Sequence, residues 1–172
     1  MDQENQIINR VANSSLVTFD LEEYYQPGER VVLDIKDNLY EGLILKEKDF
    51  REFIRANDWK KYENKFVAVT CSTDAIIPTW AFMLLSIALQ PYAKKVVYGS
   101  LSELETSIFV DQLSQIDWSS FKDVKVVVKG CSKVEVPVAV YVEVTNRLKP
   151  VVSSLMFGEA CSTVPLFKKQ KV

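Results

Sequence analysis

The fold is decided by residues 65–99, KFVAVTCSTDAIIPTWAFMLLSIALQPYAKKVVYG. The stretch begins with Lys65–Thr70, a short apolar run rich in β-branched residues, as buried parallel strands are. Pro78 stands where the first turn of a helix tolerates proline, and the apolar residues after it predict a buried helix ending at Leu89 or Gln90. Lys95–Tyr98 predicts a second strand. Two strands joined by a crossover helix are the unit from which parallel sheets are built.

The same alternation continues toward the C-terminus. Ser100 and Glu103 are spaced as a capping box, which predicts a helix over residues 100–116. Strands are predicted at 124–129 and 151–157, with a helix over 137–148 between them. The valines at even positions from 134 to 144 follow the two-residue period of a strand instead. Pro137 lies inside that run and a parallel sheet needs a crossover there, so we favour the helix.

The N-terminal part of the chain predicts a different set of elements. They are a short helix over residues 5–12, a strand at 15–20, a β-hairpin formed by 30–35 and 39–45, and an amphipathic helix over 46–57. Trp59 and Trp118, each directly after an aspartate, are expected to anchor surface loops. The whole chain, residues 1–172, therefore predicts a single α/β domain. Its mostly parallel central sheet is flanked by helices, with an N-terminal helix and hairpin added.

The composition excludes several classes of protein. The chain has no histidine, which removes Ser-His-Asp triads, Cys-His dyads and HExxH zinc sites. A formal net charge of -2 argues against a nucleic-acid partner. The longest apolar stretch, Thr79–Leu89, is shorter than the ~20 residues that span a bilayer, and the acidic N-terminus has no secretory signal pattern. We therefore expect a cytoplasmic protein without a membrane partner and, with an odd cysteine count of 3, without a disulfide framework.

The 3 cysteines all follow predicted strands. Cys71 directly follows the strand at 65–70, Cys131 follows the strand at 124–129 and Gly130, and Cys161 follows the strand at 151–157 and Gly158. Each is followed by a serine. Because parallel strands share one carboxyl edge, these thiols are expected to converge. We expect the strands before Cys71 and Cys131 to be neighbours, with Lys95–Tyr98 outside them.

Converging thiols favour a thiophilic metal site. A tetrahedral zinc site needs about four ligands. Asp74 and Glu159 lie in the same loops as the cysteines and are the candidates for a fourth ligand. An iron–sulfur cluster is the other cofactor that suits cysteine ligands. We therefore predict an accessory protein that handles metal or sulfur through Cys71, Cys131 and Cys161. In the opposing interpretation Asp74 is a loop or helix-cap residue and Glu159 an exposed loop carboxylate.

Two other functions stay open. One is a sulfur-transfer or thiol-redox enzyme that uses Cys161 or Cys131, since such chemistry needs no histidine. The other is a protein-interaction module whose cysteines only fill space, because free cysteine often behaves as a small buried hydrophobe. The partner would be another protein or a second copy of the chain.

Five segments carry a resemblance to a known family: LKEKDFREFI, VTCSTDAIIPTWAFMLL, LQPYAKKVVYG, VVVKGCSK and MFGEACSTVPL. Together they resemble a bacterial family of domains of unknown function, labelled 2480, over nearly the whole chain. The resemblance supplies no activity. It implies an association with iron–sulfur cluster assembly genes, and it supports a helix over 137–148.

Overall fold

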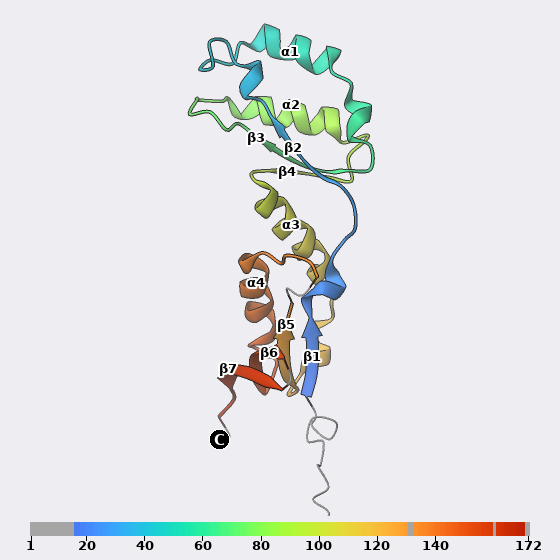
Figure 1. Ribbon diagram of the computed structural model, residues 1–172, viewed down its shortest axis with the longest axis vertical. Helices are drawn as coiled ribbons and strands as arrows, with labels where there is room; N and C mark the ends of the chain where they lie inside the picture. The colour runs from blue at the N-terminus through green and yellow to red at the C-terminus, as the bar shows by residue number, and fades with distance from the viewer. Residues whose placement is uncertain (1–15, 131–132, 160, 171–172) are drawn as a thin grey trace, which may run out of the picture. The chain divides into compact units, whose positions relative to one another are not determined.

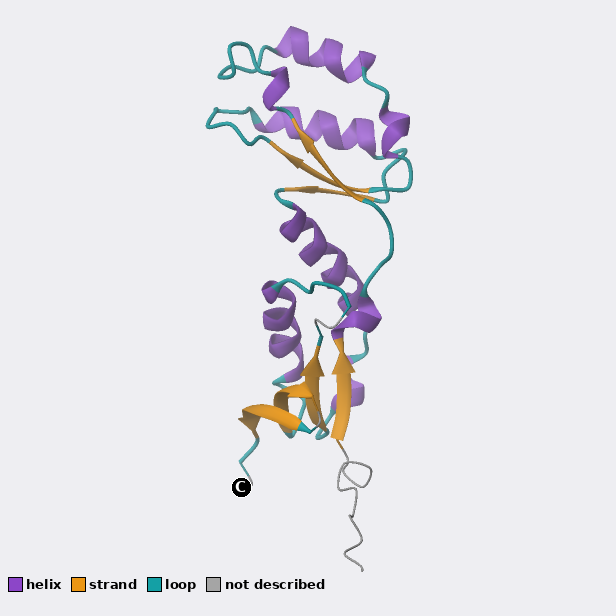
Figure 2. Cartoon of the chain, viewed as in Figure 1, coloured by secondary structure: helices purple, strands orange, loops and turns teal. Residues whose placement is uncertain are grey.

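The computed structural model describes residues 16–130, 133–159 and 161–170, and these form two compact units (Figures 1 and 2). Unit 2 consists of residues 26–108. Unit 1 consists of the described residues before and after it, 16–25 and 109–170. Both units contain a mostly parallel sheet with helices, which confirms the α/β class. No helix in the described part of the chain is long and apolar enough to cross a membrane.

The sheet of unit 2 is entirely parallel. Its order is β2 (Arg30–Asp34), β3 (Phe66–Thr70) and β4 (Lys95–Tyr98). The helices α1 (Glu47–Ala56) and α2 (Thr79–Leu89) share a hydrophobic core with one face of β3, which contributes Val67 and Val69. The alternate residues Phe66 and Ala68 pack with Leu104 and Ile108 of α3 (Leu101–Ser114). The period of two along β3 therefore buries both faces of this sheet.

The sheet of unit 1 has one additional strand. Its order is β1 (Leu16–Asp20), β5 (Lys125–Lys129), β6 (Ser154–Glu159) and β7 (Ser162–Lys168), and only the β6–β7 pair is antiparallel. The core contains residues from β1, β5 and β6, from α4 (Val138–Leu148) and from the later part of α3, including Phe109 and Leu113. Unit 1 thus repeats the architecture of unit 2 and adds β7 beside β6.

The two units are structural repeats, related by one constant shift along the chain. The corresponding elements are the 3₁₀ helices Trp59–Tyr62 and Trp118–Phe121, the strands β3 and β5, the helices α2 and α4, and the starts of β4 and β6. The first strands also correspond, because β2 pairs with β3 in the same register as β1 pairs with β5.

Individual interactions recur at the same shift. The indole N–H of Trp59 donates to the carbonyl of Ile54 at 2.7 Å, and that of Trp118 donates to the carbonyl of Leu113 at 3.2 Å. Both tryptophans therefore anchor the loop to the preceding helix, as expected. Further corresponding pairs are Phe50 and Phe109, Asn64 and Asp123 (φ 61° and 58°), Pro78 and Pro137, and Gly99 and Gly158 (φ 131° and 117°).

Most of the predicted helices and strands are confirmed with small changes at their ends. The capping box forms, since the Glu103 carboxylate accepts from the backbone N–H of Ser100 at 2.7 Å and the Ser100 hydroxyl accepts from the N–H of Glu103 at 3.3 Å. The valine-rich segment is the helix α4, because its valines at positions i and i+4, Val140 and Val144, are both fully buried. The helix predicted over residues 5–12 lies outside the described residues.

Two pairing predictions are wrong. The hairpin of residues 30–35 and 39–45 does not form, because β2 pairs in parallel with β3 and the later segment holds only a bridge between Tyr40 and Ile44. The strands β3 and β5 are not neighbours either, since each takes an N-terminal strand on one side and its own crossover strand on the other. In addition, β7 was not predicted.

Candidate functional site

Cys71 is a half-buried residue that packs against the core of unit 2. Its thiol lies 3.8 Å from the carbonyl oxygen of Thr73. Asp74 is exposed in the same loop, and it is not the helix cap, because α2 has Pro78 at its N-cap. The surroundings of Cys71 are those of a small residue that fills space.

The loop beside Cys71 is held by Asp34, at the end of β2. Its carboxylate accepts from the backbone N–H of Ser72 at 3.1 Å, from the Ser72 hydroxyl at 2.5 Å and from the N–H of Lys36 at 3.0 Å. Partial burial raises the pKa of Asp34, but these hydrogen bonds, led by the one from the Ser72 hydroxyl, outweigh it and hold the pKa below its ordinary value. Asp34 is thus a structural acceptor.

Glu159 and Cys161 lie at the opposite ends of the tight turn between β6 and β7. Glu159 is the last residue of β6 and pairs with Ser162, and Cys161 is exposed in the turn. Glu159 acts on a cation at the end of β5: the pKa of Lys129 is raised first by a hydrogen bond to Asp20, then by the charges of Asp20 and Glu159. The Lys129 ammonium and the Asp20 carboxylate are 3.0 Å apart.

The metal-site prediction loses its topological argument. Cys131 lies outside the described residues. The strands before Cys71 and Cys131 belong to different sheets, so a shared carboxyl edge does not bring these residues together. Residues 16–130, 133–159 and 161–170 contain no group of three or more cysteine, aspartate or glutamate side chains arranged to hold a metal ion. Zinc or iron–sulfur binding through these cysteines, with Asp74 or Glu159, stays a prediction.

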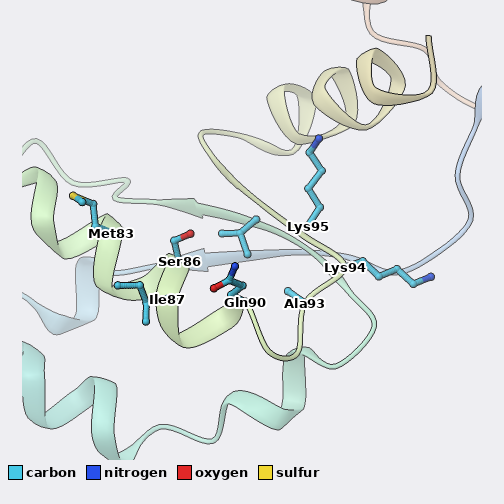
Figure 3. Close-up of a pocket in the computed structure, with 8 residues that line it drawn as sticks. Met83, Ser86, Ile87, Gln90, Ala93, Lys94 and Lys95 are labelled. Atoms are coloured by element: carbon cyan, nitrogen blue, oxygen red, sulfur yellow. The ribbon is translucent and has the colours of Figure 1, made fainter. Parts of the chain in front are cut away.

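A different site stands out in unit 2, a groove between α2 and β4 with both apolar and polar lining (Figure 3). We call it the α2–β4 groove. It is lined by Val69, Ile77, Thr79, Phe82, Met83, Ser86, Ile87, Gln90, Ala93, Lys94, Lys95, Val96 and Tyr98. Met83, Ile87 and Tyr98 are 62%, 65% and 66% exposed. In Figure 3, Met83, Ser86 and Ile87 project from α2, whereas Lys94 and Lys95 project away from that helix.

The sequence of α2 creates this groove. Its eleven residues, TWAFMLLSIAL, are apolar nearly all round. Ala81, Leu85 and Leu89 are fully buried in the unit 2 core, and Trp80, Phe82, Leu84 and Ala88 pack against it partly buried, whereas Met83 and Ile87 are exposed. A helix that is apolar on every side is ordinarily buried on every side. The face that carries Met83 and Ile87 therefore lacks a covering element within the described part of unit 2.

In unit 1, β7 pairs along the edge of β6 that corresponds to the open edge of β4. Leu155 of β6 corresponds to Val96 of β4, and Phe167 of β7 pairs opposite Leu155 and packs against the core of unit 1. The ring of Phe167 also lies under the ammonium of Lys149, 5.6 Å from its centroid. Leu155 is 1% exposed, whereas Val96 is only half-buried. Unit 1 therefore shows an antiparallel strand at this edge, whereas Val142 and Asn146 of α4, which correspond to Met83 and Ile87, stay exposed.

One family model matches residues 5–169, and its description is "Protein of unknown function (DUF2480)". The chain belongs to the DUF2480 family. Neither the curated proteins nor the solved structures contain a match to the chain. Because the description of DUF2480 names no activity, the argument about function rests on the geometry of the two units.

The α2–β4 groove was not predicted from the sequence, although two signals point to it. The first is the apolar character of α2 on all sides, which was interpreted as complete burial. The second is the repeat, visible as Asp58-Trp59 and Asp117-Trp118 followed at equal spacing by Pro78 and Pro137. Once the repeats are aligned, the segment after Gly158 that becomes β7 corresponds in unit 2 to the helix α3 after Gly99. That difference leaves β4 without the strand that β6 has.

Proposed function

We propose that this protein is a protein-interaction module that binds an extended segment of a partner protein along β4 and in the α2–β4 groove. The observation that carries the proposal is that β6 of unit 1 has the antiparallel strand β7 paired along the edge at which, in unit 2, the strand order ends with β4. Strand addition of this kind uses backbone hydrogen bonds for affinity and alternate side chains for specificity.

The chemistry of the groove suits an extended segment. Val96 and Tyr98 are two residues apart in β4, so they lie on the same face of the strand, and both line the groove. An incoming antiparallel strand would therefore place every second side chain on the face of β4 that carries Val96 and Tyr98. An aromatic side chain that becomes fully buried there contributes roughly 2–3 kcal/mol. Strand pairing adds hydrogen bonds worth about 1 kcal/mol each, so a short peptide is expected to bind with micromolar to millimolar affinity.

The half-buried Cys71 agrees with this function, because it packs against the core of the unit that contains the groove. In a protein-interaction module the cysteines need no reactivity. A metal function requires a ligand group that the described residues 16–130, 133–159 and 161–170 do not assemble, while a sulfur-transfer or thiol-redox enzyme using Cys161 or Cys131 stays a prediction.

A peptide that copies β7 tests the proposal. The probe is STVPLFQQ, which has the sequence of residues 162–169 with the two terminal lysines replaced by glutamine. We expect it to bind the full-length protein in calorimetric titration and to slow hydrogen exchange at the β4 amides. Met83→Glu and Ile87→Glu are expected to abolish binding, because each places a charge in the groove. Ile76→Glu is the matched control, since Ile76 is 94% exposed and does not line the groove. Absence of binding to the wild-type protein, or equal loss with Ile76→Glu, would refute the proposed function.

A further inference from the structure

The outer edge of β6 is a strand-binding surface whose occupant is visible, because β7 of the same chain lies along it (Figure 1). We propose that this edge is a second strand-addition site, that β7 occupies it in cis, and that a segment of a partner protein can take the place of β7. The site recognises an aromatic side chain followed two residues later by a lysine. This inference goes beyond the β4 site and does not depend on it.

The strand β7 is attached mainly through its backbone. Its burial pattern has five exposed and two half-buried residues, and Val164 and Leu166 are 58% and 52% exposed. The pairing with β6 shifts register between Leu155 and Met156, and Pro165 has no backbone N–H to donate to the ladder. A strand with so little buried side-chain surface can open locally while the rest of the unit stays folded.

Unit 2 shows that this architecture is complete without a fourth strand. Within residues 26–108 the sheet ends at β4, the counterpart of β6. The core of unit 2 nevertheless buries Val67 and Leu85 completely, just as unit 1 buries the corresponding Val126 and Val144. We therefore expect unit 1 to stay folded when β7 leaves the edge of β6.

The aromatic residue that fixes β7 is Phe167. Its ring packs against the core of unit 1, and the Lys149 ammonium lies 5.6 Å from the ring centroid. The carbonyl of Phe167 accepts a hydrogen bond from the Ser154 hydroxyl at 3.2 Å. This position suits an aromatic side chain, because a ring fills apolar space and also attracts the cation.

The second recognised residue is Lys169, which follows β7. Its backbone N–H donates to the carbonyl of Ser153 at 2.9 Å, and its ammonium lies 2.9 Å from a carboxylate oxygen of Asp123. The two side chains of this ion pair are 62% and 57% exposed, so the pair adds selectivity and little affinity. Phe167 and Lys169 together define the sequence that a competing segment must carry.

The test uses the full-length protein with β7 expelled by a substitution. Phe167→Asp places a carboxylate against the apolar core, and Met83→Glu removes binding in the α2–β4 groove. The probe is the peptide STVPLFKK, which has the sequence of residues 162–169. In calorimetric titration we expect Met83→Glu with Phe167→Asp to bind it at least about tenfold more tightly than Met83→Glu alone, in which β7 competes at an effective concentration of about millimolar. Phe167→Ala in place of Phe167→Asp should give an intermediate affinity.

Peptide variants show which residues the site recognises. STVPLAKK should bind the Met83→Glu, Phe167→Asp protein at least about tenfold more weakly than STVPLFKK, because the ring is absent. STVPLFKE should bind about two- to fivefold more weakly at low salt, with the difference reduced at high salt, because its last residue meets Asp123. Equal affinity of STVPLFKK and STVPLAKK would contradict recognition of the aromatic ring.

Hydrogen exchange separates the remaining outcomes. We expect the β5 amides to stay protected in the Phe167 variants and bound STVPLFKK to slow exchange in β6. Loss of β5 protection in both Phe167 variants would show that unit 1 needs β7 to fold, and equal binding with and without Phe167→Asp would show that the edge of β6 accepts no other strand. Either result overturns the inference. If the wild-type protein fails to bind STVPLFQQ while the Met83→Glu, Phe167→Asp protein binds STVPLFKK, the proposed function is wrong and the second site stands.

Discussion

Two equivalent phenylalanines allow the independence of the repeats to be measured. Phe50 and Phe109 correspond, both are fully buried, and each lies in the core of its own unit. The ring of Phe50 is 5.7 Å from that of Phe53 and 6.0 Å from that of Trp80. Phe109 contacts Tyr25, with 6.5 Å between ring centroids. Replacement by alanine leaves a cavity in each case, and a fully buried phenylalanine costs about 3–5 kcal/mol on such truncation.

The expected result is selective loss of protection in one unit. The free energy of unfolding of a whole protein is usually about 5–15 kcal/mol. A loss of about 3–5 kcal/mol confined to one unit therefore makes local unfolding of that unit much more frequent. We predict that Phe50→Ala accelerates native-state hydrogen exchange in β3 and α2 while β5 and α4 are unchanged. Phe109→Ala should do the reverse. Exchange is measured peptide by peptide with mass spectrometry, and Phe50→Leu and Phe109→Leu serve as conservative controls with smaller effects.

A uniform response would refute this reasoning. If either alanine variant accelerates exchange in both units by the same free energy, the chain unfolds as one cooperative domain. That was the prediction made from length and composition, and the experiment decides between it and two separately stable units. Equal exchange in all variants and wild type would instead contradict the burial of these rings.

Three further predictions concern β7 and the cysteines. Phe167→Ala is expected to lower the free energy of unfolding by about 1–3 kcal/mol in urea titration, because the ring is partly buried, whereas Leu166→Ala, 52% exposed, should change it by less than about 0.5 kcal/mol. The pKa of Asp123 is lowered, first by the hydrogen bond from Lys169, so this pair stabilises the fold at pH values above the ordinary carboxyl pKa of 3.8. The contribution is lost as the pH falls through the lower pKa of the folded state. The free energy of unfolding of Lys169→Met should therefore fall less between about pH 5 and pH 3 than that of the wild type. If the predicted metal site exists, protein purified without oxygen contains zinc or iron and Cys161→Ser reduces it, and elemental analysis without either metal would refute the prediction.

Local structure was predictable because each element has its own signal. The strands β3 and β5 are short runs of β-branched residues. The helix α4 was predicted correctly although its alternating valines resemble a strand. In that pattern Val140, Val144 and Leu148 lie at intervals of four and are fully buried, while Val138 and Val142 are 78% and 55% exposed. Alternation and helical spacing coincide at every fourth residue, so Pro137 at the N-cap was the deciding residue.

Partner strands were not predictable by the same means. The strand β2 was assigned to a hairpin because two apolar runs flank Lys36, Asp37 and Asn38. These residues form a 3₁₀ turn instead, and β2 pairs with β3. Local pattern defines a strand but not its neighbour, since parallel pairing joins residues that are far apart in the sequence. The convergence of the cysteines depended entirely on such a neighbour relation, so the error in strand order also removed the argument for the site.

The open edge of β4 has one competing explanation, which is protection against aggregation. Exposed edge strands are commonly short and carry lysine, and β4 has four residues and begins at Lys95. Protection accounts for the lysine and for the length. It does not account for Met83 and Ile87, whose exposed apolar side chains lie beside that edge and would promote the association that the lysine opposes. In unit 1 the residues that align with Met83 and Ile87 are the exposed Val142 and Asn146, so Ile87 is the apolar residue that unit 1 replaces with a polar one. The exposed Ile87 beside an open strand edge therefore favours the addition of an extended segment over simple avoidance of it.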